Sequence, residues 1–255
     1  MTENHPVRVW FITGCSTGFG RLLAEAVLQS GGKVIATARK QEQIADLEQK
    51  YPHTAKTFAL DVTNPAQVDS VVPAAIQHFG HIDVLVNNAG YGIAGAIEEV
   101  SEQESRPLFE TNVFGLLRVT RAVLPHLRQR RSGHILNLSS VGGFQSYPGF
   151  GVYCSTKFAV EGISEALHGE LAPLGIHVTV VEPGYFRTDF LKETSVQVAP
   201  HVIADYATTA GATRQHAKER NGQQQGDPKK LAVALVNLAH SKNPPLRLPL
   251  GTDTV

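Results

Sequence analysis

The sequence has few cysteines, no net charge and no long apolar run, and each of these shortages argues against a class of protein. Its 255 residues include two cysteines, which do not make a disulfide framework. Lys and Arg together number 23, as do Asp and Glu, so no overall positive field favours nucleic acid as a partner. No apolar run approaches the ~18 residues of a membrane span. The polar segment 1–6 is unlike a signal peptide. We therefore expect a cytoplasmic protein with no membrane partner.

Short apolar runs alternate with longer amphipathic segments along most of the chain. The runs expected to be strands are 7–12, 33–38, 57–60, 83–86, 134–138, 176–181 and 246–250. The segments expected to be helical are 18–30, 41–50, 65–79, 101–130, 151–173 and 231–240, with bends or boundaries at Pro107 and Pro125. This alternation predicts an α/β fold: a Rossmann-type, doubly wound parallel sheet of about seven strands with helices on both faces.

The whole chain, residues 1–255, is expected to form one dinucleotide-binding and catalytic domain. No linker, low-complexity break or repeat precedes residue 189. Between residues 192 and 228 the periodic pattern gives way to Ala, Thr, Gln and Gly. A long irregular insert in a compact domain is usually functional or mobile. We therefore expect residues 189–228 to be a mobile substrate-binding insert.

A glycine-rich turn follows the first expected strand and opens the first helix. Its glycines have the spacing G-x-x-x-G-x-G, in which Gly14 permits a tight turn and Gly18 and Gly20 remove side chains where a pyrophosphate must approach. The new helix directs free N–H groups at an anion. An ordinary turn is the alternative, but the strand–turn–helix context favours cofactor binding. The predicted contacts are Gly14, Ser16, Thr17, Gly18, Phe19 and Gly20.

The end of the second strand bears on the choice of cofactor. An NAD-preferring fold has Asp or Glu there to hold the ribose 2′-OH. This chain has Arg39 and Lys40 instead, which suit a 2′-phosphate. A solvated basic pair is the alternative reading. We favour NADP(H), with NAD(H) as the second choice.

Tyr153 and Lys157 lie four residues apart, so a helix would place them on one face. A neighbouring ammonium favours the phenolate and lowers the pKa of a phenol. The pair is therefore a candidate proton donor. A half-exposed tyrosine beside a solvated lysine is the alternative, because the pattern is short.

Taken in order, the motifs resemble those of the short-chain dehydrogenase/reductase family from residue 7 to about residue 189. They are Thr13-Gly14-x3-Gly18-x-Gly20, Asp61-Val62, Asn87-Asn88-Ala89-Gly90, Asn112, Ser140, Tyr153-x3-Lys157 and Pro183-Gly184. Each motif is weak alone, and together they are specific. The sequences of segments 12–20 and 245–251 most resemble those of the steroid- and retinol-dehydrogenase-like branch and its bacterial relatives.

The resemblance implies further cofactor contacts. Asp61 and Val62 would meet the adenine, and the residues after Gly184 the nicotinamide amide. The expected contacts from adenine to nicotinamide are Asp61, Val62, Asn88, Ala89, Gly90, Tyr153, Lys157, Pro183, Gly184, Phe186 and Thr188.

The same resemblance assigns catalysis to four residues. Tyr153 is the expected general acid–base, and Ser140 hydrogen-bonds the substrate oxygen. Lys157 is expected to lower the pKa of Tyr153 and to bind the nicotinamide ribose. Asn112 is expected to perturb its helix and to hold a water in the proton relay. Ser139 would face away from the site on a strand, so Ser140 is assigned.

Aromatic residues gather near these positions and predict an apolar substrate pocket. Phe144, Tyr147 and Phe150 precede Tyr153, while Tyr185 and Phe190 follow Gly184. The substrate contacts we expect are Ser140, Tyr147, Tyr153, Tyr185 and Phe190. A hydrophobic or aromatic ketone is the expected substrate, and plain core packing of these rings is the alternative.

The reaction predicted is hydride transfer between nicotinamide and a ketone or secondary alcohol. A non-catalytic NADP(H) sensor on the same fold is one alternative, and an epimerase or dehydratase is another. The histidines are scattered without a third ligand at metal-binding spacing, so no metal site is predicted. The family resemblance implies a homodimer or homotetramer.

Overall fold

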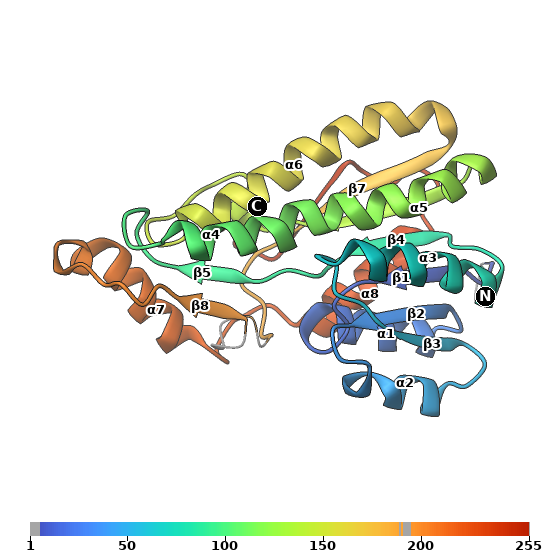
Figure 1. Cartoon of the computed structure of the whole chain (residues 1–255), viewed down its shortest axis with the longest axis horizontal. Helices are drawn as coiled ribbons and strands as arrows, with labels where there is room; N and C mark the ends of the chain where they lie inside the picture. Colours follow the sequence, from blue (N-terminus) through green and yellow to red (C-terminus); the bar gives the residue numbers. More distant parts are fainter. Residues whose placement is uncertain (1–5, 189, 191–194, 255) are drawn as a thin grey trace.

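In the described part of the chain, residues 6–188, 190 and 195–254, seven parallel strands form the central sheet (Figure 1). The structure is a computed structural model. The strand order is β3-β2-β1-β4-β6-β7-β9, which confirms the predicted doubly wound Rossmann-type sheet. The strands are β1 (Val9–Ile12), β2 (Lys33–Ala38), β3 (Ala55–Ala59), β4 (Val84–Asn87), β6 (Gly133–Leu138), β7 (Ile176–Pro183) and β9 (Arg247–Leu250).

Helices cover both faces of this sheet. On β1, Trp10 and Ile12 pack into a core with α1 and α8, whereas Val9 and Phe11 pack on the other face with α3, α5 and α6. The helices are α1 (Gly18–Gln29), α2 (Ala45–Lys50), α3 (Pro65–Phe79), α4 (Glu102–Phe109), α5 (Leu116–Arg130), α6 (Gly151–Leu171), α7 (Ala212–Arg220) and α8 (Pro228–Ala239).

The order in which strands are added reverses between β1 and β4, which pair in parallel in the middle of the sheet. From β1 the chain continues outward through β2 to β3, and from β4 it continues the other way through β6 and β7. Such a reversal leaves a crevice beyond the carboxyl ends of the two central strands. The expected cofactor motifs follow these ends.

A second, two-stranded sheet was not predicted. Its strands are β5 (Gly92–Ala94) and β8 (Val196–Val198), which pair in parallel. Residues 195–228 also contain helix α7, so the expectation of an irregular segment there is wrong for the part that the structure describes. The insert also includes residues 189 and 191–194, which lie outside the described residues. Figure 1 shows α7 and β8 beside β5, at the end of the molecule away from α2.

The long segment 101–130 is broken, but not at either proline. Pro107 lies inside α4 and Pro125 inside α5. Between these helices, Glu110–Gly115 forms a π-helical turn, in which Asn112 is buried. The prolines therefore fail as boundary signals here, whereas the expected perturbation of the helix around Asn112 is present.

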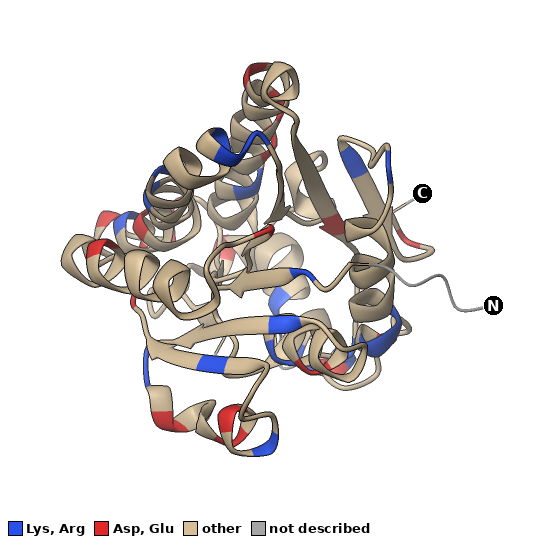
Figure 2. Ribbon diagram, turned by 90° about the vertical axis from the view of Figure 1, so that its right-hand side faces the viewer, with Lys and Arg blue, Asp and Glu red and all other residues tan. Residues whose placement is uncertain are grey.

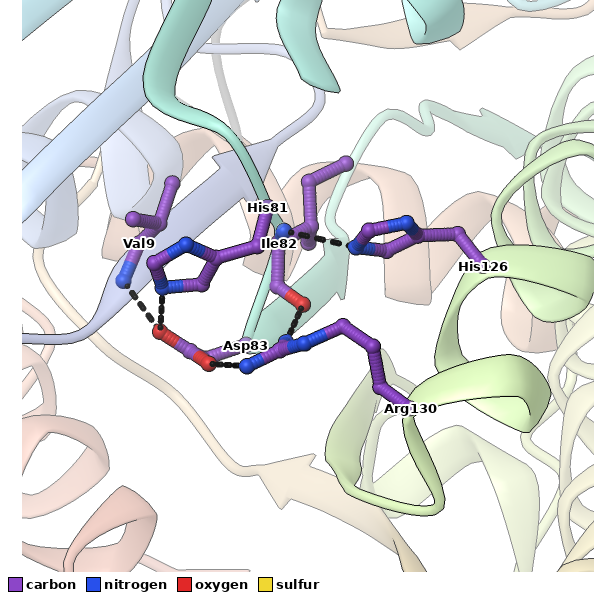
Figure 3. A network of polar contacts seen from close by, with 6 residues as sticks. All are labelled: Val9, His81, Ile82, Asp83, His126 and Arg130. Carbon is purple, nitrogen blue, oxygen red and sulfur yellow. Dashed lines mark hydrogen bonds and ion pairs between the residues drawn. The ribbon is translucent and has the colours of Figure 1, made fainter. Parts of the chain in front are cut away.

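A polar network joins the amino ends of the central strands β1 and β4 to α5 (Figure 3). Asp83 accepts a hydrogen bond from the backbone N–H of Val9 at 2.8 Å and pairs with Arg130 at 3.0 Å. Arg130 also donates to the carbonyl of Ile82, whose N–H donates to Nε2 of His126 at 3.2 Å. These contacts connect the amino ends of β1 and β4 to α5 and take no part in the site.

Charged residues of both signs lie interspersed on the outer helices and loops in the view of Figure 2, in keeping with the equal totals of acid and base. Among the described residues, no helix has both the length and the apolarity needed to cross a membrane.

Candidate active site

A cleft of about 1520 Å³ opens at the carboxyl ends of the central strands. It brings together all but two of the catalytic and contact residues assigned from the sequence. The predicted residues that line it are Gly14, Ser16, Thr17, Gly18, Phe19, Arg39, Lys40, Asp61, Val62, Asn88, Ala89, Gly90, Ser140, Tyr147, Tyr153, Lys157, Pro183, Gly184, Tyr185, Phe186, Thr188 and Phe190. Gly20 and Asn112 are not part of the lining.

The glycine-rich turn has the backbone that its sequence suggests. Gly14 and Gly18 have φ angles of 71° and 59°, a region that favours glycine. Gly20 has a different reason to lack a side chain, because a Cβ there would overlap the carbonyl of Gly14 and the amide of Asn88. Gly20 therefore permits the turn to close, and it lies behind the cleft wall.

Thr13 and Asn88 hold this turn against the end of β4. The hydroxyl oxygen of Thr13 accepts hydrogen bonds from the backbone N–H groups of Asn88 and Ala89, both at 3.0 Å. The side-chain amide of Asn88 donates to the carbonyls of Thr13 at 2.8 Å and Gly14 at 3.0 Å. Thr13 had no predicted site role. A hydroxyl residue at the strand end, directly before the first glycine, was the available signal.

The basic end of the cleft lies beyond β2 and β3. Arg39 and Lys40 are exposed and line it. Asp61 is held in place because its carboxylate accepts from the N–H and hydroxyl of Thr63, at 2.9 and 2.7 Å. Arg118 donates to the carbonyl of Val62 at 2.7 Å. This end of the cleft therefore has two cationic side chains, Arg39 and Lys40, beside a backbone segment at Asp61 and Val62 that hydrogen bonds hold in place.

Tyr153, Lys157 and Ser140 meet at the other end. Tyr153 and Lys157 lie on one face of α6 and are 7% and 8% exposed. The Lys157 ammonium lies 5.8 Å from the centroid of the Tyr153 ring and donates to the carbonyl of Leu138 at 2.7 Å. Ser140 follows β6 and is within hydrogen-bonding reach of the Tyr153 hydroxyl.

Burial controls the protonation of this pair. It raises the pKa of Tyr153 above its ordinary value, against the effect of the hydrogen bond with Ser140. Burial also lowers the pKa of Lys157 to about 8, against the charge of Glu161. The pKa of Tyr153 is therefore raised by burial, whereas the sequence predicted a lowered pKa, and Lys157 is not among the groups that shift it here. A phenol that retains its proton at neutral pH is suited to donate it.

Asn112 lies behind the cleft and connects two of its walls. Its Oδ1 accepts from the N–H of Tyr91 at 3.0 Å, and its Nδ2 donates to the carbonyl of Tyr91 at 2.9 Å. Nδ2 also donates to the hydroxyl of Thr156 at 3.1 Å. Both amide N–H groups are thus in use, so a water held by this side chain would have to donate to Oδ1.

The turn after β7 closes the cleft near Gly18. Gly184 donates to the carbonyl of Leu250 at 2.9 Å, and the N–H of Tyr185 donates to the carboxylate of Asp253 at 2.6 Å. A Cβ on Gly184 would overlap that carboxylate. Asp253 was not foreseen, because nothing in the local sequence links it to a turn so far away.

Aromatic rings pack around Tyr153. The ring of Phe150 lies 6.1 Å and that of Phe190 lies 5.6 Å from the ring of Tyr153, between centroids. Tyr147 packs in the same cluster. Phe144, one of the aromatic residues from which the pocket was predicted, is 48% exposed and does not line the cleft.

Gln224 also lines the cleft, although no sequence motif indicated it. It is 3% exposed, and neither atom of its side-chain amide has a partner among the described residues. In the same part of the chain, no group of three or more His, Cys, Asp or Glu side chains is placed to hold a metal ion.

The parallel sheet, its switch point and the glycine-rich turn define a dinucleotide-binding type of α/β protein. The sequence profile of the short chain dehydrogenase family matches residues 8–199. The chain belongs to this family of oxidoreductases.

Two curated relatives cover nearly the whole chain. An oxidoreductase of Botryotinia fuckeliana, BOA17, is 43% identical over 249 residues, which are 97% of this chain and 90% of the relative. A 3-ketodihydrosphingosine reductase of Bacteroides thetaiotaomicron is 38% identical over 247 residues, which are 96% of this chain and 88% of the relative.

Solved structures agree in fold, and two of them hold a nicotinamide dinucleotide. A short-chain dehydrogenase from Streptomyces avermitilis is 44% identical, with a TM-score of 0.91 over 98% of this chain and 90% of its own. ElxO with NADP bound is 26% identical, with a TM-score of 0.78 over 96% and 97% of the two chains. A Burkholderia phymatum relative in complex with NAD is 25% identical, with a TM-score of 0.82 over 95% and 88%. These neighbours support a nicotinamide cofactor and do not distinguish NADP from NAD.

Proposed function

We propose that this protein is an NADP(H)-dependent oxidoreductase that interconverts a hydrophobic ketone and the corresponding secondary alcohol. The observation that carries the proposal is one cleft with two different ends. Tyr153, Lys157 and Ser140 gather at one end, and Arg39 and Lys40 line the other.

The cleft fits a dinucleotide. Gly14 and Gly18 leave the backbone of the first turn open, and the amino end of α1 directs free N–H groups into the cleft. A Cβ on Gly90 would lie 3.0 Å from Oδ1 of Asn112 and 3.9 Å from Nζ of Lys157. The absence of a side chain at Gly90 therefore leaves space beside the lysine. These residues would hold the sugar–phosphate backbone of the cofactor.

Arg39 and Lys40 favour the phosphorylated cofactor. Neither Asp nor Glu stands at the end of β2 to accept a ribose 2′-OH. A guanidinium matches a phosphate with paired hydrogen bonds. The remaining predicted contacts, from Asp61 to Thr188, would then follow the cofactor along the cleft.

The chemistry at the other end is acid–base chemistry by Tyr153. When bound, the nicotinamide cofactor supplies the hydride for reduction or accepts it in oxidation. Tyr153 donates its proton to the carbonyl oxygen of the ketone, and Ser140 donates a hydrogen bond to the same oxygen. Lys157 remains protonated beside Tyr153 and offsets the negative charge that forms on the phenol when it releases its proton.

The aromatic rings around Tyr153 support an apolar substrate. Tyr147, Phe190 and the exposed ring of Tyr185 would contact its hydrocarbon part. The name of the Bacteroides relative, a reductase of 3-ketodihydrosphingosine, supports a ketone as well. We propose further that the protein works in the cytoplasm as one domain, as a homodimer or homotetramer, with residues 189–228 moving over the substrate.

The experiment that tests the function follows NADPH oxidation by its near-ultraviolet absorbance. Aromatic, aliphatic and steroid ketones are supplied as substrates, and NADH is run in parallel. Tyr153→Phe is the matched control, because it removes the hydroxyl and keeps the ring. We expect turnover with NADPH that is lost in the variant while NADPH binding remains. Tight binding of NADPH with no turnover on any carbonyl would favour a sensor instead.

A further inference from the structure

A pair of buried carboxyl groups lies directly behind the candidate active site. Glu161 of α6 and Glu182 of β7 are 7% and 3% exposed. Nε of Arg247, on β9, lies 3.5 Å from Glu161 and 3.7 Å from Glu182. Neither carboxylate oxygen of Glu161 accepts a hydrogen bond within the described residues. Burying acidic side chains with so few hydrogen bonds and ion pairs lowers the stability of the fold, which points to a functional role for the pair.

The pair touches the segments that carry the site. Glu161 lies one helical turn after Lys157 on α6, and Glu182 directly precedes Pro183. A Cβ on Gly143 would meet both the hydroxyl of Ser139 and Oε1 of Glu161, so α6 and the turn after β6 are in close contact there.

The charged and polar groups around Glu161 come from three elements. Lys157 and Glu165 share its helix, Glu182 faces it from β7, and Arg247 faces it from β9. Arg247 is 46% exposed at its side chain and also binds Glu165 at 2.9 Å, so its charge is shared and partly solvated. Burial and the neighbouring Glu161 raise the pKa of Glu182 to about 7, whereas Arg247 lowers it. Burial and the neighbouring carboxylate thus disfavour the charged form of Glu182 within this pair.

Lys157 has few other groups to support its charge. Its ammonium donates to the carbonyl of Leu138 and lies over the ring of Tyr153, and no described carboxylate forms an ion pair with it. Burial lowers the pKa of Lys157 to about 8, and Glu161 is the group that opposes this shift. The amine would otherwise lose its proton close to neutral pH.

We propose that Glu161 is a positioning residue whose buried negative charge keeps Lys157 protonated while the enzyme works. Glu182 and Arg247 hold that charge in place behind the site. The inference rests on the role that the proposed function gives to Lys157. Without Glu161, Lys157 loses its proton at lower pH, and any step that needs the ammonium fails at the same lower pH.

The experiment is a titration of Lys157 itself, which requires neither substrate nor cofactor. The protein is labelled with ¹³C at lysine Cε, and the signal of Lys157 is assigned by its loss in Lys157→Arg. Glu161→Gln is compared with wild type and with Glu165→Gln, an exposed carboxylate one turn further along the same helix. Circular dichroism checks the fold, and Glu161→Met replaces the glutamine variant if that variant does not fold. The double variant Glu161→Gln/Glu182→Gln removes both acids.

We expect the midpoint of Lys157 to fall by about one pH unit or more in Glu161→Gln, to fall at least as far in the double variant and to stay unchanged in Glu165→Gln. An unchanged midpoint in both Glu161 variants would overturn the proposal. A shift in the double variant alone would also overturn it, since Glu182 would then supply the charge.

The pH dependence of NADPH binding and turnover is measured on the same proteins. We expect the alkaline loss of both to begin at lower pH in Glu161→Gln. If wild type reduces no carbonyl, the proposed function fails, while the Lys157 titration still decides whether Glu161 controls its charge.

Discussion

Glu99 and Arg214 form a buried ion pair between the loop before α4 and helix α7. The carboxylate of Glu99 also accepts from the backbone N–H groups of Ala96 at 2.7 Å and Ile203 at 3.0 Å. Arg214 is the main cause that lowers the pKa of Glu99 to about 2. Glu99 is thus the point at which residues 203–214 are attached beside β5.

Glu99→Gln should loosen this attachment. The amide keeps the shape of the side chain but loses the charge that Arg214 and the two N–H groups bind. Hydrogen bonds to a charged group contribute about 1.5–3 kcal/mol, so amide hydrogens in residues 203–214 should exchange about 10- to 100-fold faster. Hydrogen-exchange mass spectrometry measures this. Glu98→Gln is the control, because Glu98 is exposed and binds only the hydroxyl of Tyr206 among the described residues. Equal exchange rates in both variants would show that Glu99 does not hold residues 203–214 in place.

Asn112→Ala should reduce both stability and turnover. The change leaves the N–H and carbonyl of Tyr91 without the partners that Asn112 provides. Each buried polar group left unpaired costs about 1–3 kcal/mol, and urea unfolding measures the sum. Thr156→Val removes one bond to Asn112 and leaves both bonds to Tyr91, so its loss should be smaller. A larger loss of stability in Thr156→Val would show that the bond from Asn112 to Thr156 of α6 contributes more than its bonds to Tyr91.

The sequence predicted local features well because their causes are local. The glycine-rich turn needs positive φ at Gly14 and Gly18, and the spacing of Tyr153 and Lys157 places them on one helical face. The order of strands and helices followed from periodicity in the same way. The predicted lining from Asp61 to Thr188 came instead from the family resemblance.

What the sequence did not predict depends on distant contacts. β5 and β8 are three residues each, and their pairing partners are about a hundred residues apart, too short and too separate for a periodic signal. Asp253 reaches Tyr185 from the far end of the chain. The pKa of Tyr153 was misjudged because a sequence displays the neighbouring charge of Lys157 but not the extent of burial.

Arg39→Ala should weaken NADPH more than NADH. A lost charge-assisted hydrogen bond to a phosphate costs about 1.5–3 kcal/mol, so KM for NADPH should rise about 10- to 100-fold while KM for NADH changes little. Steady-state kinetics with a fixed ketone measures both. Lys40→Ala tests the neighbouring cation, whose flexible ammonium should contribute less. A wild type that prefers NADH would contradict the assignment of a phosphate to Arg39.

Tyr147→Ala and Phe190→Ala should reduce activity selectively on large ketones. Both rings belong to the cluster around Tyr153, so truncation removes apolar contact from a bulky substrate. Burying an apolar side chain contributes about 1.5–3 kcal/mol, which corresponds to roughly a 10- to 100-fold loss in kcat/KM for large ketones relative to small ones. Phe144→Ala is the control, because Phe144 lies outside the cleft. An unchanged ratio in both variants would show that these rings only pack the core.

Acid should destabilise the fold through His134. This side chain is 2% exposed, and its Nε2 lies 2.9 Å from the hydroxyl of Thr179, which itself donates to the carbonyl of Pro245. Nε2 must therefore donate, which places a proton on Nε2. Burial first, and then His177 and Arg8, lower the pKa of His134 to about 3.

The sign of the effect follows from the unfolded chain, where histidine titrates near pH ~6.5. Below that pH the unfolded state binds a proton that the folded state refuses, so this contribution to stability is complete above pH ~6.5 and falls by about 1.4 kcal/mol per pH unit down to pH ~3. Urea unfolding at several pH values measures the slope. His134→Gln should be less stable at neutral pH and should lose less on acidification, whereas the exposed His201→Gln should follow wild type. Parallel slopes in wild type and His134→Gln would show that carboxyl groups, such as Glu99, account for the acid sensitivity instead.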